Sequence, residues 1–107
     1  MSVSEITVDE LADRLDAGGF LLDVRQPDEY EAGHVPGAVL IPLAEVPDRM
    51  SELPAGTEML VICRSGARSL AAAEFLQQQQ IPAVNVAGGT LAWIESGREV
   101  VTGAGAT

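Results

Sequence analysis

The chain has a single cysteine and a single histidine, and it has no long apolar run. One cysteine cannot form an internal disulfide, so a reducing compartment is expected. One cysteine with one histidine is too few for a zinc site, and we predict no metal and no other cofactor. No apolar stretch approaches the roughly 20 residues that span a bilayer, and residues 1–5 lack the basic and apolar regions of a secretory signal. The sequence therefore predicts a cytoplasmic protein with no membrane partner.

Positive charge is also scarce. The formal net charge is −10, and the chain has six arginines and no lysine. Binding to nucleic acid needs a basic face, so nucleic acid is not expected as a partner. Arg25, Arg64 and Arg68 nevertheless fall in or beside the motifs described below. Arginine concentrated near one thiol indicates a small anionic ligand, although the overall acidity also serves to keep the protein in solution.

The apolar pattern predicts one domain in which strands alternate with helices. With 47% apolar and 21% charged residues, the 107-residue chain can bury one modest core. Strands are expected at residues 5–7, 20–24, 38–41, 59–62 and 83–86. Helices are expected from residue 8 to the glycines at 18–19, and at residues 28–32, 43–53, 69–80 and 90–96. This alternation predicts an α/β fold with a central, mainly parallel five-stranded sheet flanked by helices on both faces. The domain is expected over residues 1–102, followed by a flexible tail at 103–107 that has nothing to bury.

The stretch at residues 59–69 is the expected centre of the chemistry. An apolar strand ends on Cys63, a turn containing glycine follows, and a helix comes next. This arrangement aims backbone N–H groups and the positive end of a helix dipole at one point, which favours a thiolate there. Arg64 and Arg68 add positive charge. The stretch therefore suits a nucleophilic sulfur together with a bound anion.

Four separated motifs together resemble the rhodanese domain. They are DVR at 23–25 with EY at 29–30, GHVPGA at 33–38, CRSGARS at 63–69 and GGTLAW at 88–93. The resemblance is to the stand-alone, single-domain members of the family and covers most of the chain. It implies a small α/β domain with a central parallel sheet, and a sulfurtransferase activity of the thiosulfate:cyanide type.

The resemblance also implies roles for the loop residues. Cys63 is the catalytic nucleophile, which takes the outer sulfur of a donor such as thiosulfate and holds it as a persulfide. The sulfur then passes to an acceptor: cyanide, a small thiol, thioredoxin or a sulfur-carrier protein. Backbone N–H groups of about residues 64–68 stabilise the bound anion. The substrate-binding residues are Arg64, Ser65, Gly66, Ala67 and Arg68.

Either loop arginine could hold the sulfonate end of thiosulfate, because a guanidinium matches tetrahedral oxyanions. Relatives that favour thiosulfate tend to carry basic side chains within the loop, which places Arg64 ahead of Arg68. The other role open to Arg68 is to tie the loop to the rest of the fold.

Several polar residues near these motifs have simpler structural interpretations. We expect Asp23 and Arg25 to organise neighbouring loops. His34 lies in a turn rich in glycine and proline, where fixing the backbone is favoured over general-base catalysis. Trp93 is expected to pack in the core. A solvated helix face is expected for the carboxylates Asp28, Glu29 and Glu31.

Two other functions stay open. A non-catalytic persulfide carrier or partner-docking module would share the fold, but an intact Cys63 and Arg64 favour catalysis. Phosphatases and arsenate reductases of related architecture separate their cysteine and arginine by five residues. Here only four residues lie between Cys63 and Arg68, a loop that suits sulfur and would cramp phosphate. We therefore predict sulfur transfer.

Overall fold

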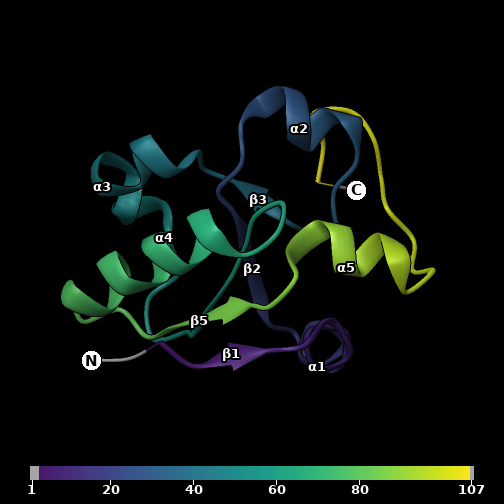
Figure 1. The fold of residues 1–107 in the computed structure, drawn as a ribbon. Helices are drawn as coiled ribbons and strands as arrows, with labels where there is room; N and C mark the ends of the chain where they lie inside the picture. The colour runs from purple at the N-terminus through teal and green to yellow at the C-terminus, as the bar shows by residue number, and fades with distance from the viewer. Residues whose placement is uncertain (1–2, 107) are drawn as a thin grey trace.

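A computed structural model describes residues 3–106 and contains one five-stranded sheet (Figure 1). The strands run in the order β1-β5-β4-β2-β3, and every neighbouring pair is parallel. Their bounds are β1 Glu5–Ile6, β2 Phe20–Asp23, β3 Val39–Leu40, β4 Met59–Ile62 and β5 Ala83–Val86. The predicted α/β fold with a five-stranded parallel sheet is confirmed. Strands β4 and β5 match the predicted ranges residue for residue.

Five α-helices cover both faces of the sheet, as predicted. They are α1 Val8–Asp16, α2 Pro27–Ala32, α3 Val46–Arg49, α4 Ala67–Gln78 and α5 Gly89–Glu95. Residues of α1, α2 and α5 pack on one face, and residues of α3 and α4 pack on the other (Figure 1). Within residues 3–106, no helix has both the length and the apolar character needed to cross a membrane. The cytoplasmic location stays a prediction.

Strand β4 contributes to two apolar clusters at once. Leu60 and Ile62 belong to the cluster under α1 and α5, whereas Met59 and Val61 belong to the cluster under α4. Successive side chains of a strand point to opposite faces, and a parallel sheet covered on both faces needs apolar residues at every position. The continuous apolar run before Cys63 is therefore the signature of the central strand.

The first helix begins as its sequence predicts. The Thr7 hydroxyl accepts from the Glu10 N–H at 3.1 Å, and the Glu10 carboxylate accepts from the Thr7 N–H at 3.0 Å. This reciprocal pair is a capping box, which satisfies two N–H groups that the helix leaves without partners.

Two predicted helices differ from the structure by more than one residue at an end. The single helix predicted at residues 43–53 is wrong, because this stretch forms three short pieces: a 3₁₀ turn at Leu43–Glu45, α3, and a 3₁₀ turn at Met50–Glu52. Pro47 has no N–H to donate to the carbonyl four residues earlier, so no α-helix can run through it from residue 43. The helix predicted at 69–80 is instead α4 at 67–78, with its two extra residues at the start.

The segment after α5 returns along α2 (Figure 1). His34 and Val101 form an antiparallel bridge with two backbone hydrogen bonds of 2.9 Å. Further along, Gly103 N donates to Glu31 O at 2.8 Å, and Gly37 N donates to Ala106 O at 2.7 Å. The flexibility expected of residues 103–107 stays a prediction, and residue 107 lies outside the described residues.

Candidate active site

Cys63 follows the last residue of β4, the middle strand of the sheet. Residues 63–66 form the loop that leads into α4. In parallel α/β sheets, ligands bind beyond the carboxyl ends of the strands, where the connecting loops gather. The sheet therefore places the single thiol of the chain where such folds carry their chemistry.

The Cys63 sulfur lies at the bottom of this loop and is surrounded by hydrogen-bond donors. Gly66 N donates to the sulfur at 3.1 Å, and the Ser69 hydroxyl lies 3.2 Å from it. Burial raises the pKa of the Cys63 thiol, but hydrogen bonds from the Ser69 hydroxyl and from the N–H groups of Ser69, Gly66 and Ser65 outweigh it and lower the pKa. The loop is thus built to hold sulfur as an anion.

Gly66 gives the loop its shape. Its φ of +115° lies in the left-handed region, which a residue with a side chain enters only with strain. Because the chain turns there, Ala67 and Arg68 are already helical, and α4 begins two residues before its predicted start. Ser69 therefore lies in the first turn of α4, where its N–H donates to the sulfur, a contact that the apolar pattern of the helix did not reveal.

The start of α5 is hydrogen-bonded to the backbone of the loop. Thr90 donates to Cys63 O from its N–H at 2.9 Å and from its hydroxyl at 3.1 Å, and Leu91 N donates to Arg64 O at 3.1 Å. A Cβ on Gly89 would lie 2.5 Å from Cys63 O and 2.6 Å from Arg64 O. The second glycine of the GGT motif is therefore required for this close approach of two backbones.

The two loop arginines have different surroundings. Arg68 donates from both terminal nitrogens to the Glu29 carboxylate, at 2.7 and 2.8 Å, and so ties the loop to α2. Arg64 is exposed and forms no ion pair with any residue in the described range 3–106. The solvated face expected for Glu29 is wrong, because its carboxylate is the partner of Arg68. The pair joins residues 39 positions apart in the sequence, in helices that pack on opposite faces of the sheet.

The Glu29–Arg68 pair predicts a pH dependence of stability. Hydrogen bonding to Arg68 lowers the pKa of Glu29 from 4.5 to about 2. Because the folded pKa lies below the unfolded one, the pair stabilises the fold above pH 4.5, and this contribution is lost as the pH falls towards 2. We expect wild type to exceed Glu29→Gln in melting temperature near neutral pH, and the difference to vanish in that acidic window. Glu31→Gln, at an exposed position of α2, is the control, and a difference that does not change with pH would contradict the assignment.

Asp23 and Arg25 form a buried ion pair behind the loop. Arg25 donates to the two Asp23 carboxylate oxygens from Nε at 3.0 Å and from Nη2 at 2.8 Å. Its guanidinium also donates to the carbonyls of Gly33 at 2.9 Å and Glu29 at 3.3 Å. These contacts hold both ends of α2 to the end of β2, which is an organising role.

His34 has both ring nitrogens occupied. Nδ1 lies 2.7 Å from Tyr30 O, and Nε2 lies 2.8 Å from Gly105 O. The ring is fully buried and stacks on Tyr30 with 3.6 Å between centroids. The ring is therefore enclosed by the fold, and His34 holds the 33–37 turn against the C-terminal segment.

The site also contains residues that sequence reasoning did not single out. Ser69, Asn85 and Thr90 are all buried polar residues that contact the loop. A signal existed for Asn85, because it interrupts an apolar strand, and a buried amide needs hydrogen-bond partners. Which partners it has depends on the order of the strands, and the sequence alone does not give that order.

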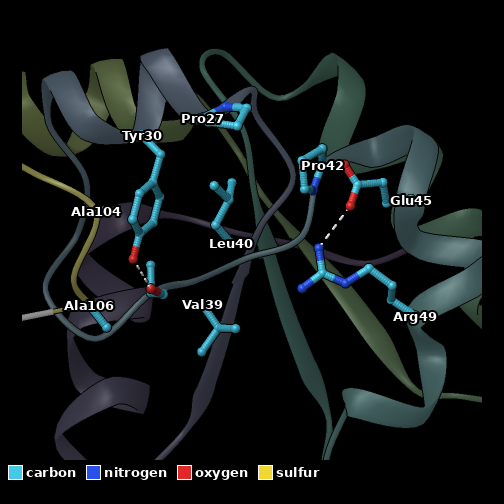
Figure 2. A pocket seen from close by; sticks show the side chains of 10 residues that line it. Pro27, Tyr30, Val39, Leu40, Pro42, Glu45, Arg49, Ala104 and Ala106 are labelled. Atoms are coloured by element: carbon cyan, nitrogen blue, oxygen red, sulfur yellow. Dashed lines mark hydrogen bonds and ion pairs between the residues drawn. The ribbon is translucent and has the colours of Figure 1, made fainter.

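A surface pocket of about 480 Å³ lies elsewhere, between α2 and α3 (Figure 2). Its lining includes Tyr30, Leu40, Glu45 and Arg49, and the C-terminal segment closes one side at Ala106. The pocket contains no cysteine, and its arginine is paired with Glu45 at 2.9 Å. Its lining thus offers neither a thiol nucleophile nor an unpaired arginine, and the Cys63 loop remains the candidate active site.

Comparison with known proteins agrees with this geometry. The family model described as rhodanese-like domain matches residues 7–96. A sulfurtransferase of Allochromatium vinosum is 41% identical over 102 residues, which cover 92% of this chain and 95% of that protein. The crystal structure of a rhodanese-related protein from Thermoplasma volcanium matches with a TM-score of 0.87 at 36% identity. The match covers 94% of this chain and 99% of the Thermoplasma chain. The crystal structure of a thiosulfate sulfurtransferase from Pseudomonas aeruginosa has a TM-score of 0.86 at 28% identity, covering 94% of this chain and 20% of its own.

Proposed function

We propose that this chain, which belongs to the rhodanese-like domain family, transfers sulfane sulfur from thiosulfate to a thiophilic acceptor through a persulfide on Cys63. The homologues and the fold support a general sulfurtransferase role. The choice of thiosulfate is supported by the loop arginines and by the name of the structural relative from Pseudomonas aeruginosa.

The reaction has two balanced steps. In the first, the Cys63 thiolate attacks the outer sulfur of thiosulfate, a bond between the two sulfur atoms forms, and the sulfur–sulfur bond of thiosulfate breaks. Sulfite leaves with the bonding electron pair, and a persulfide anion remains on Cys63. In the second step, cyanide or a thiolate attacks the terminal sulfur, and the Cys63 thiolate leaves. With cyanide the product is thiocyanate, and the enzyme returns to its starting state.

The observation that carries the proposal is the surroundings of the Cys63 sulfur. The sulfur receives the Gly66 N–H at 3.1 Å and lies beside the start of α4, while exposed Arg64 is left without an ion pair among residues 3–106. The inner donors suit the anionic sulfur, and the guanidinium suits the sulfonate end of a small dianion.

Two features weigh against the phosphatase or arsenate reductase alternative. Four residues separate Cys63 from Arg68, so the loop is one residue shorter than in those enzymes. Arg68, the arginine that would hold the oxyanion there, is already bound to Glu29 through both terminal nitrogens. A persulfide carrier would share the first step of the reaction. For the acceptor in the second step, we propose cyanide, a small thiol, thioredoxin or a sulfur-carrier protein.

Steady-state kinetics test the proposed function. Initial rates of thiocyanate formation are measured while thiosulfate and cyanide are varied together. A covalent intermediate predicts parallel lines in double-reciprocal plots, because sulfite leaves before cyanide binds. Lines that intersect would contradict the two-step mechanism. The absence of thiocyanate formation above the uncatalysed rate would contradict the thiosulfate:cyanide activity itself.

Arg64 is expected to act on the donor step alone. Arg64→Ala should raise the KM for thiosulfate by about 10- to 100-fold, because it removes charge-assisted hydrogen bonds to the sulfonate. Once the variant is loaded with excess thiosulfate, its persulfide should pass to cyanide at nearly the wild-type rate. The matched control is Arg14→Ala, which removes an exposed arginine that pairs with Glu58 at 2.8 Å. Equal losses in both steps would contradict this role.

A further inference from the structure

A buried hydrogen-bond network lies beneath the Cys63 loop and has no part in the steps above. It joins Ser69 in α4, Asn85 in β5 and Glu5 in β1. Ser69 is fully buried and Asn85 is 1% exposed. The Ser69 hydroxyl lies 3.2 Å from the Cys63 sulfur, so the network reaches the nucleophile itself.

The orientation of the Asn85 side chain is fixed by its two acceptors. Its amide nitrogen donates to the Glu5 carboxylate at 2.9 Å and to Gly66 O at 3.1 Å. Both partners are oxygen atoms that accept only, so exchanging the amide nitrogen and oxygen would place three acceptors together. The Asn85 carbonyl oxygen must therefore face Ser69.

The Ser69 hydroxyl has one hydrogen and three neighbours that could accept it. These are the Asn85 carbonyl oxygen at 2.5 Å, the Cys63 sulfur at 3.2 Å and Gly66 O at 3.2 Å. Two oxygens 2.5 Å apart need a hydrogen between them, and the Asn85 oxygen has none to give. The hydroxyl hydrogen consequently points at Asn85, and a lone pair of the Ser69 oxygen is left for the sulfur.

We propose that Asn85 is a positioning residue that competes with the Cys63 sulfur for the single hydroxyl hydrogen of Ser69. While the sulfur is protonated, its S–H donates to Ser69, and Ser69 donates to Asn85. When the sulfur loses its proton to solvent, the thiolate draws the hydroxyl hydrogen away from Asn85. Asn85 thus favours the thiol, and Ser69 favours the thiolate. The inference rests on the proposed function only in that the thiolate is the nucleophile.

Several other charged groups lie on the elements around the sulfur, and among them only Glu5 loses a partner, because Asn85→Leu removes its amide donor equally with and without Ser69. They are Arg64 in the loop, Arg68 in α4, Glu29 in α2, the Asp23–Arg25 pair at the end of β2, and Glu5 in β1.

The test is a pH titration of the thiolate by its ultraviolet absorbance. The signal reports on Cys63 because the chain has one cysteine, and burial raises the pKa of the single tyrosine, Tyr30, which also absorbs there when ionised. Four proteins are compared: wild type, Asn85→Leu, Ser69→Ala and the double variant. Leucine keeps the branched shape of asparagine but is larger and makes the surroundings of the sulfur less polar, so the effect of Asn85→Leu is measured both with and without Ser69.

Asn85→Leu changes the pKa of Cys63 in two backgrounds, one with Ser69 and one with Ser69→Ala. The change with Ser69 present should lie about 0.5 to 1 below the change in the Ser69→Ala background. Ser69→Ala alone should raise the pKa. Equal effects of Asn85→Leu in both backgrounds would overturn the proposal. A rise of the pKa that appears only with Ser69 present would also overturn it, because Asn85 would then support the thiolate.

Two further variants keep this test sharp. Gln77→Ala removes another side-chain amide, which donates to Ala83 O in β5 at 3.1 Å. This variant should leave the titration of Cys63 unchanged. If Asn85→Leu does not fold, Asn85→Ala replaces it in the same cycle. The titration needs no sulfur donor, so its outcome is independent of whether thiosulfate is turned over, and failure of the two proposals can be told apart.

Discussion

Replacing Cys63 with serine is expected to reduce sulfur transfer by at least about a thousandfold. A serine hydroxyl keeps its proton at neutral pH, and a persulfide requires sulfur at this position. The donors around the site, such as the Gly66 N–H at 3.1 Å, would remain but would face a neutral oxygen. Thiocyanate formation should therefore fall to the rate of the uncatalysed reaction.

The Cys63→Ser result needs a control for folding. Trp93 is the only tryptophan, is buried, and donates from Nε1 to Glu99 O at 2.8 Å, so its fluorescence reports on packing near α5. We expect this fluorescence and the melting temperature to stay close to those of wild type. Ser51→Ala, at an exposed position remote from the loop in sequence, should keep full activity. Turnover clearly above background in a folded Cys63→Ser protein would contradict the role of Cys63.

Asp23→Ala is expected to have the largest effect on stability, lowering the free energy of unfolding by about 3–5 kcal/mol. Asp23 is fully buried and Arg25 is 5% exposed, so removing the carboxylate leaves a buried guanidinium without its counter-charge. The remaining partners of Arg25 are the carbonyls of Gly33 and Glu29, which carry no net charge. Denaturant titration measures the change directly.

Two companion variants separate the charge effect from simple loss of side-chain atoms. Asp16→Ala removes an exposed carboxylate at the end of α1 and should change the free energy of unfolding by no more than about 0.5 kcal/mol. Asp23→Leu combined with Arg25→Met removes both charges and should recover part of the lost stability. If the double variant loses as much free energy of unfolding as Asp23→Leu and Arg25→Met lose together when measured singly, an unpaired buried charge is not the cause.

The sequence predicted those parts of the fold that depend on local pattern. The apolar runs before Cys63 and around Val84 gave β4 and β5 without error, because strands buried on both faces contain little else. Thr7 and Glu10 gave the start of α1, since a capping box involves only neighbouring residues. Local pattern failed at Pro47, where the missing N–H breaks a stretch whose apolar spacing still suggests one helix.

Of the candidate site, only the nucleophile and its loop were predictable from the sequence. The position of Cys63 between a strand and a helix, and the resemblance of the motifs, indicated the nucleophile and its loop. The partners of that loop come from distant segments: Glu29 pairs with Arg68 across 39 positions, and Asn85 reaches Gly66 across 19. These contacts follow from the strand order β1-β5-β4-β2-β3, which differs from the order in sequence.

The same dependence on tertiary structure separates the two arginines. The resemblance alone placed Arg64 ahead of Arg68 as the residue that holds the donor, and the residue spacing did not decide between them, because both lie within five positions of Cys63. The structure places Arg68 on Glu29 and leaves Arg64 exposed. An anchored arginine keeps the loop in shape, and an exposed one is available to an incoming anion, which is why we assign donor binding to Arg64.

The measurement that tests the account most directly is the intact mass of the protein after incubation with thiosulfate, followed by a cyanide chase. We predict that wild type gains one sulfur atom and loses it on addition of cyanide, while Cys63→Ser gains none. That result would demonstrate a persulfide on Cys63 as the intermediate. A wild-type protein whose mass does not change, or a sulfur atom that is also gained by Cys63→Ser, would contradict the proposed mechanism.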